Sequence, residues 1–109
     1  MQIYEPAEDS YLLQKYVRKY AQGRVLDIGT GSGIQALAAS KVIDVREVIA
    51  IDINKEAIKQ LQEKAKLDKK IKPKFSNLFE KVSTKFDTII FNPPYLPEDS
   101  LELESSKII

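Results

Sequence analysis

The sequence predicts an α/β protein, in which a doubly wound parallel sheet carries four strands within this chain. Three observations support the prediction. Short apolar runs alternate with stretches of helical spacing, a glycine-rich turn joins the first run to a helix, and unusual polar residues follow each predicted strand. Parallel strands joined by helices need right-handed crossovers, and their ligands bind beyond the carboxyl ends of the strands.

Each element follows from its local pattern. Asp9 or Ser10 can cap a first helix, which Gly23 ends. Asn54 can cap a later helix whose apolar residues lie on one side. Two prolines after residue 91 stop the last strand, because they supply no N–H to a ladder. The predicted strands are residues 24–28, 47–53, 73–76 and 86–91, with helices before 23, over 34–41 and over about 55–65.

Composition excludes several kinds of chemistry. The chain has 109 residues, of which 43% are hydrophobic and 30% are charged, and its net charge is +1, as expected of one globular domain. It contains neither cysteine nor histidine, so we expect no disulfide, no histidine catalysis and no metal site. It has no apolar run of about 20 residues and does not begin like a signal peptide, which predicts a cytoplasmic protein without a membrane partner.

The strongest binding signal is the segment DIGTGSG at residues 27–33. Its three glycines let the backbone turn sharply and let a ligand approach the main chain. The dinucleotide fingerprint needs its last glycine one position later, where this chain has Ile34. Asp27 would repel a pyrophosphate, but it suits a ligand with an ammonium and a sulfonium group, such as S-adenosylmethionine.

An acid also ends the second predicted strand. Asp52 stands where a carboxylate accepts hydrogen bonds from both ribose hydroxyls of a bound nucleoside. The alternative for this region is a tight turn followed by a helix-capping acid. The glycine loop and Asp52 together favour a nucleoside-type cofactor site.

The segment Asn92-Pro93-Pro94-Tyr95 follows the fourth predicted strand. An amide or exocyclic amino nitrogen is a poor nucleophile, because its lone pair is delocalised. The Asn92 side-chain oxygen and the Pro93 carbonyl could accept both N–H bonds and aim that lone pair at a methyl group, while Tyr95 stacks on the planar group. A proline pair that merely ends a strand explains neither Asn92 nor Tyr95.

The glycine loop, the acid after the second strand and the N-P-P-Y segment resemble a class I S-adenosylmethionine-dependent methyltransferase, which has a Rossmann-like fold. The opening YEPAEDS at residues 4–10 is similar to the HemK-like glutamine methyltransferases, in their short archaeal and eukaryotic branch. The resemblance implies N-methylation of the side-chain amide of the glutamine in the Gly-Gly-Gln motif of a peptide-chain release factor.

The resemblance also implies roles for individual residues. The target amide would be held by the catalytic segment Asn92, Pro93, Pro94 and Tyr95. The cofactor would be bound by Pro6, Glu8, Asp9, Ser10, Asp27, Gly29, Thr30, Gly31, Gly33, Asp52, Ile53, Asn77, Leu78 and Asn92. Relatives usually have an aspartate at position 77, so Asn77 would accept from the adenine amino group without a charge and lower the affinity.

The family's sheet has seven strands, whereas this sequence predicts four. Residues 1–109 are therefore expected to be the amino-terminal, cofactor-binding part of a single methyltransferase domain. Residues 86–91 would then form an exposed apolar edge, which favours pairing. We expect a homodimer through that edge or a covering partner, and the resemblance implies a small zinc-binding activator subunit.

Two other functions stay open. N-P-P-Y also resembles motifs of adenine amino-group methyltransferases that act on DNA or RNA. Nucleic acid is the less favoured partner, because the basic stretch at residues 55–74 has no interleaved aromatic residues. The chain could also be a truncated, catalytically incomplete half-domain that binds cofactor without turnover.

Overall fold

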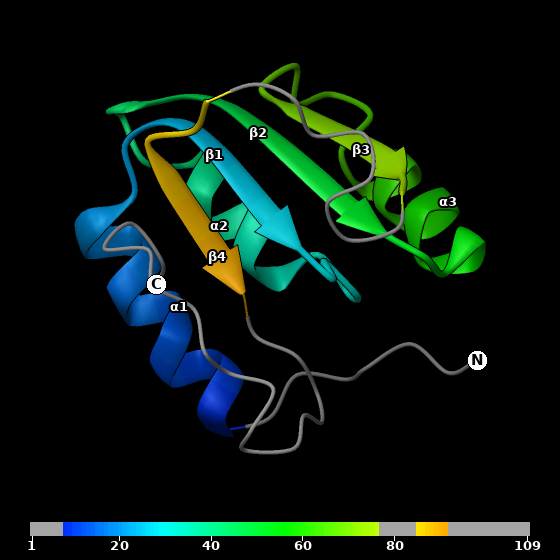
Figure 1. Cartoon of the computed structure of the whole chain (residues 1–109), viewed down its shortest axis with the longest axis horizontal. Coiled ribbons are helices and arrows are strands. Elements are labelled where there is room, and N and C mark those ends of the chain that lie inside the picture. The colour runs from blue at the N-terminus through cyan, green and yellow to red at the C-terminus, as the bar shows by residue number, and fades with distance from the viewer. Residues whose placement is uncertain (1–7, 77–84, 92–109) are drawn as a thin grey trace.

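A computed structural model describes residues 8–76 and 85–91 and contains a four-stranded parallel sheet with three helices (Figure 1). In chain order the elements are α1 (Glu8–Tyr20), β1 (Gly23–Ile28), α2 (Ile34–Ser40), β2 (Val45–Asp52), α3 (Lys55–Lys64), β3 (Ile71–Phe75) and β4 (Thr88–Phe91). The strand order is β3-β2-β1-β4, and every pairing is parallel. The predicted fold class is confirmed.

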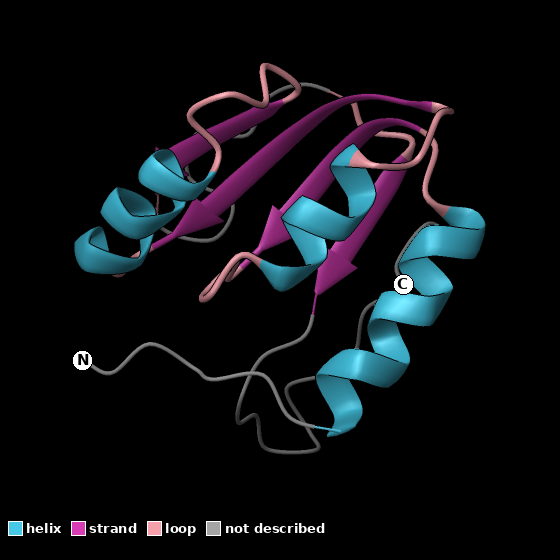
Figure 2. Cartoon of the chain, turned by 180° about the vertical axis from the view of Figure 1, so that it is seen from behind, coloured by secondary structure: helices cyan, strands magenta, loops and turns pink. Residues whose placement is uncertain are grey.

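All three described helices cover one face of the sheet, as Figure 2 shows from behind. The steps from β1 to β2 and from β2 to β3 run in one direction, so right-handed crossovers put α2 and α3 on the same side. β4 then pairs with the other edge of β1. This reversal creates a topological switch point between the carboxyl ends of β1 and β4, where α/β sheets bind their ligands.

The core lies on both faces of the two central strands. Alternate residues point to opposite sides, so Val25 packs under the helices whereas Leu26 packs on the other face. Ala36 and Ala39 are fully buried, which lets α2 lie close to the sheet. Asn54 caps α3 as predicted, because its side chain accepts hydrogen bonds from the N–H groups of two residues in the first turn.

Several predicted boundaries differ in the structure; β2, for example, begins at Val45 and not at residue 47. Asp9 and Ser10 lie inside the first turn of α1, which begins by Glu8, so neither is the cap. β3 begins at Ile71, two residues before Pro73; the proline is tolerated because β3 pairs with β2 alone in the described sheet.

β4 starts later than predicted, at Thr88. The Asp87 carboxylate accepts a hydrogen bond from the Arg24 N–H at 2.8 Å, and the guanidinium of Arg24 lies 4.8 Å from the centre of the Phe86 ring. The Asp87 N–H also donates to the Arg24 carbonyl at 2.8 Å, so residues 86 and 87 meet the start of β1 through side chains and one backbone hydrogen bond.

The sequence predicts that residues 86–91 expose apolar side chains at an edge of the sheet, but several of these side chains are buried. Phe86, Thr88 and Ile90 are buried, and Ile90 belongs to the same cluster as Val17 of α1. The Thr88 hydroxyl also donates to the Gln22 carbonyl at 3.1 Å. The prediction is wrong for Thr88 and Ile90, because α1 and the segment after it cover the helical face of β4, and for Phe86, which packs in the cluster on the other face of the sheet.

A charge network joins three strands at the amino end of the sheet. Glu47 accepts a hydrogen bond from Nε of Arg24 at 2.6 Å and another from Nζ of Lys72. These two hydrogen bonds, together with the positive charges of their donors, lower the pKa of Glu47 to about 2. The network stabilises the alignment of β1, β2 and β3.

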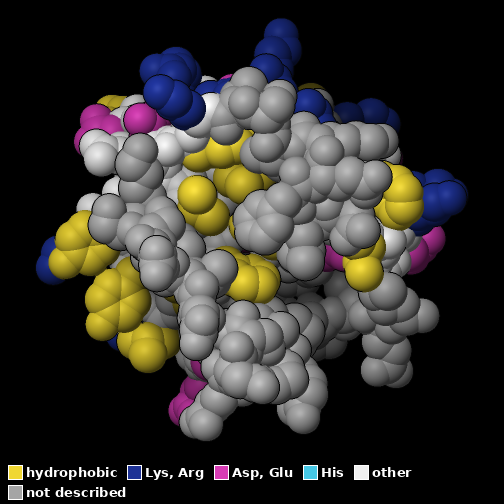
Figure 3. Space-filling model, in the orientation of Figure 1, with side chains coloured by type: hydrophobic (Ala, Val, Ile, Leu, Met, Phe, Trp, Pro, Cys, Tyr) yellow, Lys and Arg dark blue, Asp and Glu magenta, His cyan; other side chains and the backbone are white. Residues whose placement is uncertain are grey.

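The outward side of α1 carries exposed apolar side chains, which appear at the left of Figure 3. Leu12, Tyr16 and Tyr20 repeat at a spacing of four residues, and the rings of Tyr16 and Tyr20 stack with their centres 6.3 Å apart. Within residues 8–76 and 85–91, the longest helix is too short and too polar to cross a membrane.

Candidate functional site

The glycine loop lies beyond the carboxyl end of β1, at the switch point. Gly29, Gly31 and Gly33 have φ values of 67°, 54° and 83°, which residues with a side chain rarely adopt. A Cβ on Gly33 would lie 2.6 Å from Cδ1 of Leu61, whereas a Cβ on Gly29 would meet nothing within 4 Å. The loop therefore packs against α3 at its end and opens onto free space at its start.

Backbone hydrogen bonds hold the loop against the neighbouring strand. The Thr30 N–H donates to the Ile51 carbonyl at 2.9 Å, and the Gly33 N–H donates to the Thr30 carbonyl at 2.8 Å. The Gly31 N–H donates to Oδ2 of Asp52 at 2.8 Å. These bonds preorganise the turn before any ligand is present.

Asp52 ends β2 and is half-buried. Its Oδ1 accepts from the Asn54 N–H at 2.8 Å, and its Oδ2 accepts from Gly31. Each carboxylate oxygen can accept a second bond, so Asp52 keeps capacity for two ligand hydroxyls. The next residue, Ile53, is 50% exposed and offers an apolar surface beside the acid.

Asp27 is the buried acid of the site, with 3% of its surface exposed. It accepts a hydrogen bond from the Thr30 hydroxyl at 2.8 Å and another from the backbone N–H of Ala36. Burial nevertheless raises the pKa of Asp27 to about 7, and the charge of Asp52 adds to the rise. A positively charged ligand beside Asp27 would favour its ionised form.

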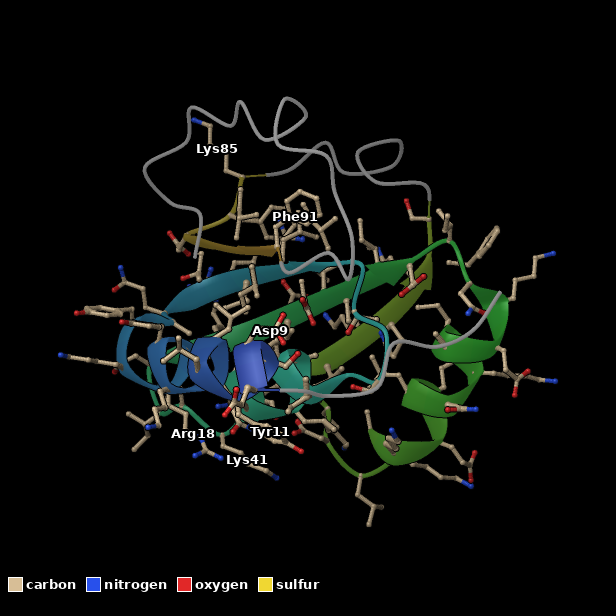
Figure 4. All side chains as sticks on the ribbon, turned by 90° about the horizontal axis from the view of Figure 1, so that it is seen from below. Asp9, Tyr11, Arg18, Lys41, Lys85 and Phe91 are labelled. Atoms are coloured by element: carbon tan, nitrogen blue, oxygen red, sulfur yellow. The ribbon has the colours of Figure 1, made fainter. Side chains whose placement is uncertain are left out.

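The first turn of α1 closes another side of this region. Ser10 is 1% exposed, and its carbonyl accepts a hydrogen bond from Nε2 of Gln35 at 2.8 Å. Glu8 and Asp9 are exposed at the same turn. Figure 4, which views the molecule from below, shows Asp9 on the helical side of the sheet and Phe91 of β4 across it.

Sequence reasoning missed two residues of this region. Among the described residues, the buried side-chain atoms without a hydrogen-bond partner are Oε1 of Gln35 and Oγ of Ser76. Gln35 is the second residue of α2, just after the glycine loop, and the Ser76 N–H donates to the Asp52 carbonyl at 3.0 Å. The available signal was a glutamine on the otherwise apolar and small-residue side of a helix that follows a glycine loop.

The structure describes ten of the predicted cofactor residues and gathers them around the carboxyl ends of β1 and β2 and the first turn of α1. They are Glu8, Asp9, Ser10, Asp27, Gly29, Thr30, Gly31, Gly33, Asp52 and Ile53. The predictions for Pro6, Asn77, Leu78, Asn92, Pro93, Pro94 and Tyr95 lie outside the described residues. In the part of the chain that is described, no three acidic side chains gather as a metal-ion site.

The strand order, the glycine loop after β1 and the acid after β2 define the class I methyltransferase fold. A solved ribosomal protein L11 methylase from Lactobacillus delbrueckii subsp. bulgaricus shares this fold with a TM-score of 0.68 and 32% identity, over 79% of this chain and 47% of that chain. Trm5b from Pyrococcus abyssi gives a TM-score of 0.75 and 28% identity, over 98% of this chain and 32% of that one.

The family model of the methyltransferase small domain matches residues 7–106, so the chain belongs to the methyltransferase small domain family. A protein from Methanocaldococcus jannaschii, provisionally named a protein N5-glutamine methyltransferase, is 45% identical over 97 residues, which are 88% of this chain and 49% of that protein. A release factor glutamine methyltransferase from Streptococcus pneumoniae is 46% identical over 81 residues, or 72% and 29% of the two chains. This chain thus spans about half the length of the first relative and about a third of the second.

Proposed function

We propose that this chain is the cofactor-binding part of an S-adenosylmethionine-dependent methyltransferase that methylates a glutamine side-chain amide in a peptide-chain release factor. The observation that carries the proposal is the hydrogen bond from the Gly31 N–H to Asp52. It joins the glycine loop to a carboxylate that is placed to accept hydrogen bonds from ribose hydroxyls. The names of the relatives from M. jannaschii and S. pneumoniae, both glutamine methyltransferases, support the substrate.

The residues present fit this cofactor. Free space above Gly29 leaves room for a ligand against the main chain. Asp52 has acceptor capacity for the two ribose hydroxyls, and Ile53 offers an apolar face to the adenine ring. Asp27 supplies a buried carboxylate for a cationic ligand, and the partnerless oxygens of Gln35 and Ser76 supply further polar contacts.

The substrate side begins where β4 ends. Phe91 is the last residue of β4, at the switch point, and the N-P-P-Y segment follows it directly in sequence. In this proposal Asn92 and Pro93 accept both N–H bonds of the target amide, and Tyr95 stacks on its plane.

The cofactor supplies a methyl group bound to a positively charged sulfur. With the cofactor bound, the amide nitrogen held by Asn92 and Pro93 would receive the methyl group, the electron pair of the carbon–sulfur bond would remain on sulfur, and the nitrogen would lose a proton to water. Orientation by residues 92–95 is the main contribution of the protein, so no histidine base is required.

A second candidate is methylation of an adenine amino group in RNA or DNA. It is favoured by the N-P-P-Y segment, and one solved neighbour, the M. jannaschii tRNA m1G37 methyltransferase with a TM-score of 0.71 and 28% identity, acts on RNA, although on a guanine. An adenine amino group poses the same lone-pair problem as an amide. The transfer assay below distinguishes the two substrates.

The assembly remains part of the proposal. Within the described sheet β4 pairs with β1 alone, so its outer backbone groups can accept a partner strand. A second copy of the chain or the small zinc-binding activator subunit implied by the family resemblance are the partners we expect. A catalytically incomplete half-domain would bind the cofactor but would need the covering partner or the remaining sequence for turnover.

Methyl-transfer assays with labelled S-adenosylmethionine test the function. The acceptors are a release factor, the same factor with its Gly-Gly-Gln glutamine changed to alanine, and an RNA and a DNA oligonucleotide. Both this chain and a longer form should bind S-adenosylhomocysteine, and the longer form should label only the intact release factor. Labelling of nucleic acid instead, or failure of both forms to bind, would overturn the proposal.

A further inference from the structure

We propose that the side-chain carbonyl of Gln35 accepts a hydrogen bond from the ammonium group of the cofactor, while its amide N–H holds the first turn of α1 in place. The inference deepens the proposed function and rests on it, because the ligand is the cofactor proposed above. It adds to the site a residue that the sequence analysis did not select.

The position of Gln35 suits such a role. It is the second residue of α2 and follows the glycine loop by two positions, and only 4% of its surface is exposed. Nε2 donates to the Ser10 carbonyl at 2.8 Å, across 25 residues of sequence. This contact fixes the orientation of the amide, since the flipped form would set its oxygen against the carbonyl oxygen of Ser10.

The other end of the amide has no partner. Oε1 of Gln35 is buried without a donor, and burying an amide oxygen in this way is unfavourable. The other buried side chains of this helix are small, namely Ala36, Ala38, Ala39 and Ser40. The bond to Ser10 accounts for the amide N–H but leaves Oε1 without a donor, so this oxygen points to a donor that arrives with a ligand.

A second acceptor, the buried carboxylate of Asp27 on β1, is linked to the same turn of α2. The N–H of Ala36, the residue after Gln35, is hydrogen-bonded to the buried carboxylate of Asp27. Thr30 supplies one more donor to that carboxylate, yet burial still disfavours its charged form. The two acceptors therefore need both hydrogen-bond donors and positive charge.

Among the groups that the cofactor presents, the primary ammonium meets both needs. It carries three N–H donors and a positive charge, like the ammonium of lysine. The ribose hydroxyls and the adenine amino group are neutral and would leave the charge of Asp27 unbalanced. The ammonium is thus the group that can satisfy Gln35 and Asp27 together.

Calorimetry with two ligands tests the assignment. S-adenosylhomocysteine carries the ammonium, whereas 5′-methylthioadenosine has the same nucleoside and sulfur without the amino-acid part. Gln35→Met should weaken S-adenosylhomocysteine binding about tenfold or more, the scale of a hydrogen bond to a charged group. Binding of 5′-methylthioadenosine should change less than about twofold, because the lost contact is with the absent group.

Ser76→Ala serves as the matched control, because it removes the other partnerless buried oxygen of the described residues. We expect it to affect both ligands equally. Gln35→Glu keeps acceptor oxygens at position 35, so it should retain the preference for S-adenosylhomocysteine even if the loss of the Ser10 contact lowers the melting temperature.

Three results would overturn the inference: equal loss of both ligands in Gln35→Met, no loss of either, or disappearance of the preference in Gln35→Glu. An equal loss would mean that Gln35 only holds α1 in place. Failure of the proposed cofactor looks different, because the unmodified chain would then bind neither ligand, and failure of the proposed substrate would appear only in the transfer assay. Melting curves of all variants without ligand establish that each is folded.

Discussion

The Gly31 N–H donates a hydrogen bond to Oδ2 of Asp52, so the acid that ends β2 also fixes the loop that follows β1. Two neighbouring strands therefore share one binding surface. Because the same carboxylate orders the loop and has capacity left for a ligand, a change at Asp52 should act on both functions.

Asp52→Ala should weaken S-adenosylhomocysteine binding by roughly 1–3 kcal/mol, the scale for polar groups left without partners. Calorimetry measures this directly, and Asp44→Ala provides a control at an exposed acid on the opposite end of the strand. Equal affinity of the Asp52→Ala variant and the unmodified chain would contradict the assignment. Tight binding of NADH by the unmodified chain would also contradict the assignment.

Asp27 should make binding of the cationic cofactor depend on pH. Its pKa of about 7 means that below neutral pH the side chain becomes protonated and loses its attraction for a cation. Affinity for S-adenosylmethionine should therefore fall as the pH drops from 8 to 5.5, approaching about tenfold per pH unit well below the pKa of Asp27.

Asp27→Asn removes the titrating group and should give a nearly flat profile. The absence of histidine from the sequence leaves few other groups that titrate in this range. Near pH 6.5 binding should also release a proton, which calorimetry in two buffers of different ionisation enthalpy detects. A pH-independent affinity of the unmodified chain would refute the role of Asp27.

Glu47 should stabilise the fold in a pH-dependent way. Its pKa in the folded state is about 2, below the ordinary value of 4.5, so its contribution is complete above about 4.5 and is lost as the pH falls through 2. Urea unfolding of Glu47→Gln should show lower stability than the unmodified chain at pH 7, and the difference should vanish toward pH 2.

The matched control is Glu63→Gln, which breaks an exposed pair with Lys66 at 3.6 Å. Exposed pairs contribute little, so this variant should unfold like the unmodified chain. If Glu47→Gln also unfolds like the unmodified chain at pH 7, the network at the amino end of the sheet does not stabilise it.

Asn92→Ala should abolish methyl transfer while cofactor affinity falls far less, because the proposal assigns the side-chain oxygen of Asn92, which also borders the cofactor, to the acceptor amide. Lost orientation reduces rates by orders of magnitude. The assay uses this chain and any longer form of it that shows transfer, and Asn77→Ala is the comparison, since it should weaken cofactor binding instead. Transfer at the unmodified rate by Asn92→Ala would exclude the proposed role.

A protein of residues 1–109 should associate in solution. In the described sheet the outer side of β4 has no strand beside it, and unpaired backbone groups favour a second copy. Sedimentation velocity at micromolar concentration should detect a dimer, and addition of an activator subunit should replace it with a mixed complex. A compact monomer at all concentrations would contradict this prediction.

The sequence predicted the parts of the site that depend on local chemistry. Only glycine adopts the positive φ values of the loop readily, so the spacing of Gly29, Gly31 and Gly33 identified it. Asp27 and Asp52 stand next to strand ends, where a parallel sheet gathers its ligands.

The contacts between distant segments could not be predicted in the same way. The bond between Gln35 and the Ser10 carbonyl depends on how α1 packs against α2, which no local pattern encodes. The burial of Thr88 and Ile90 likewise depends on the side of the sheet that α1 covers.

The strand order also determines when the contacts between strands can form during translation. Arg24 at the start of β1 meets Asp87 beside β4, 63 residues later in the chain. At about 5–20 residues per second, a ribosome needs roughly 3 to 13 seconds to make that stretch. The nascent chain can thus pair β1 with β2 and close the Gly31–Asp52 contact before β4 leaves the exit tunnel. Binding of the methyl donor could then precede completion of the segment that receives the substrate, and chaperones would meet a sheet with one side of β1 still unoccupied.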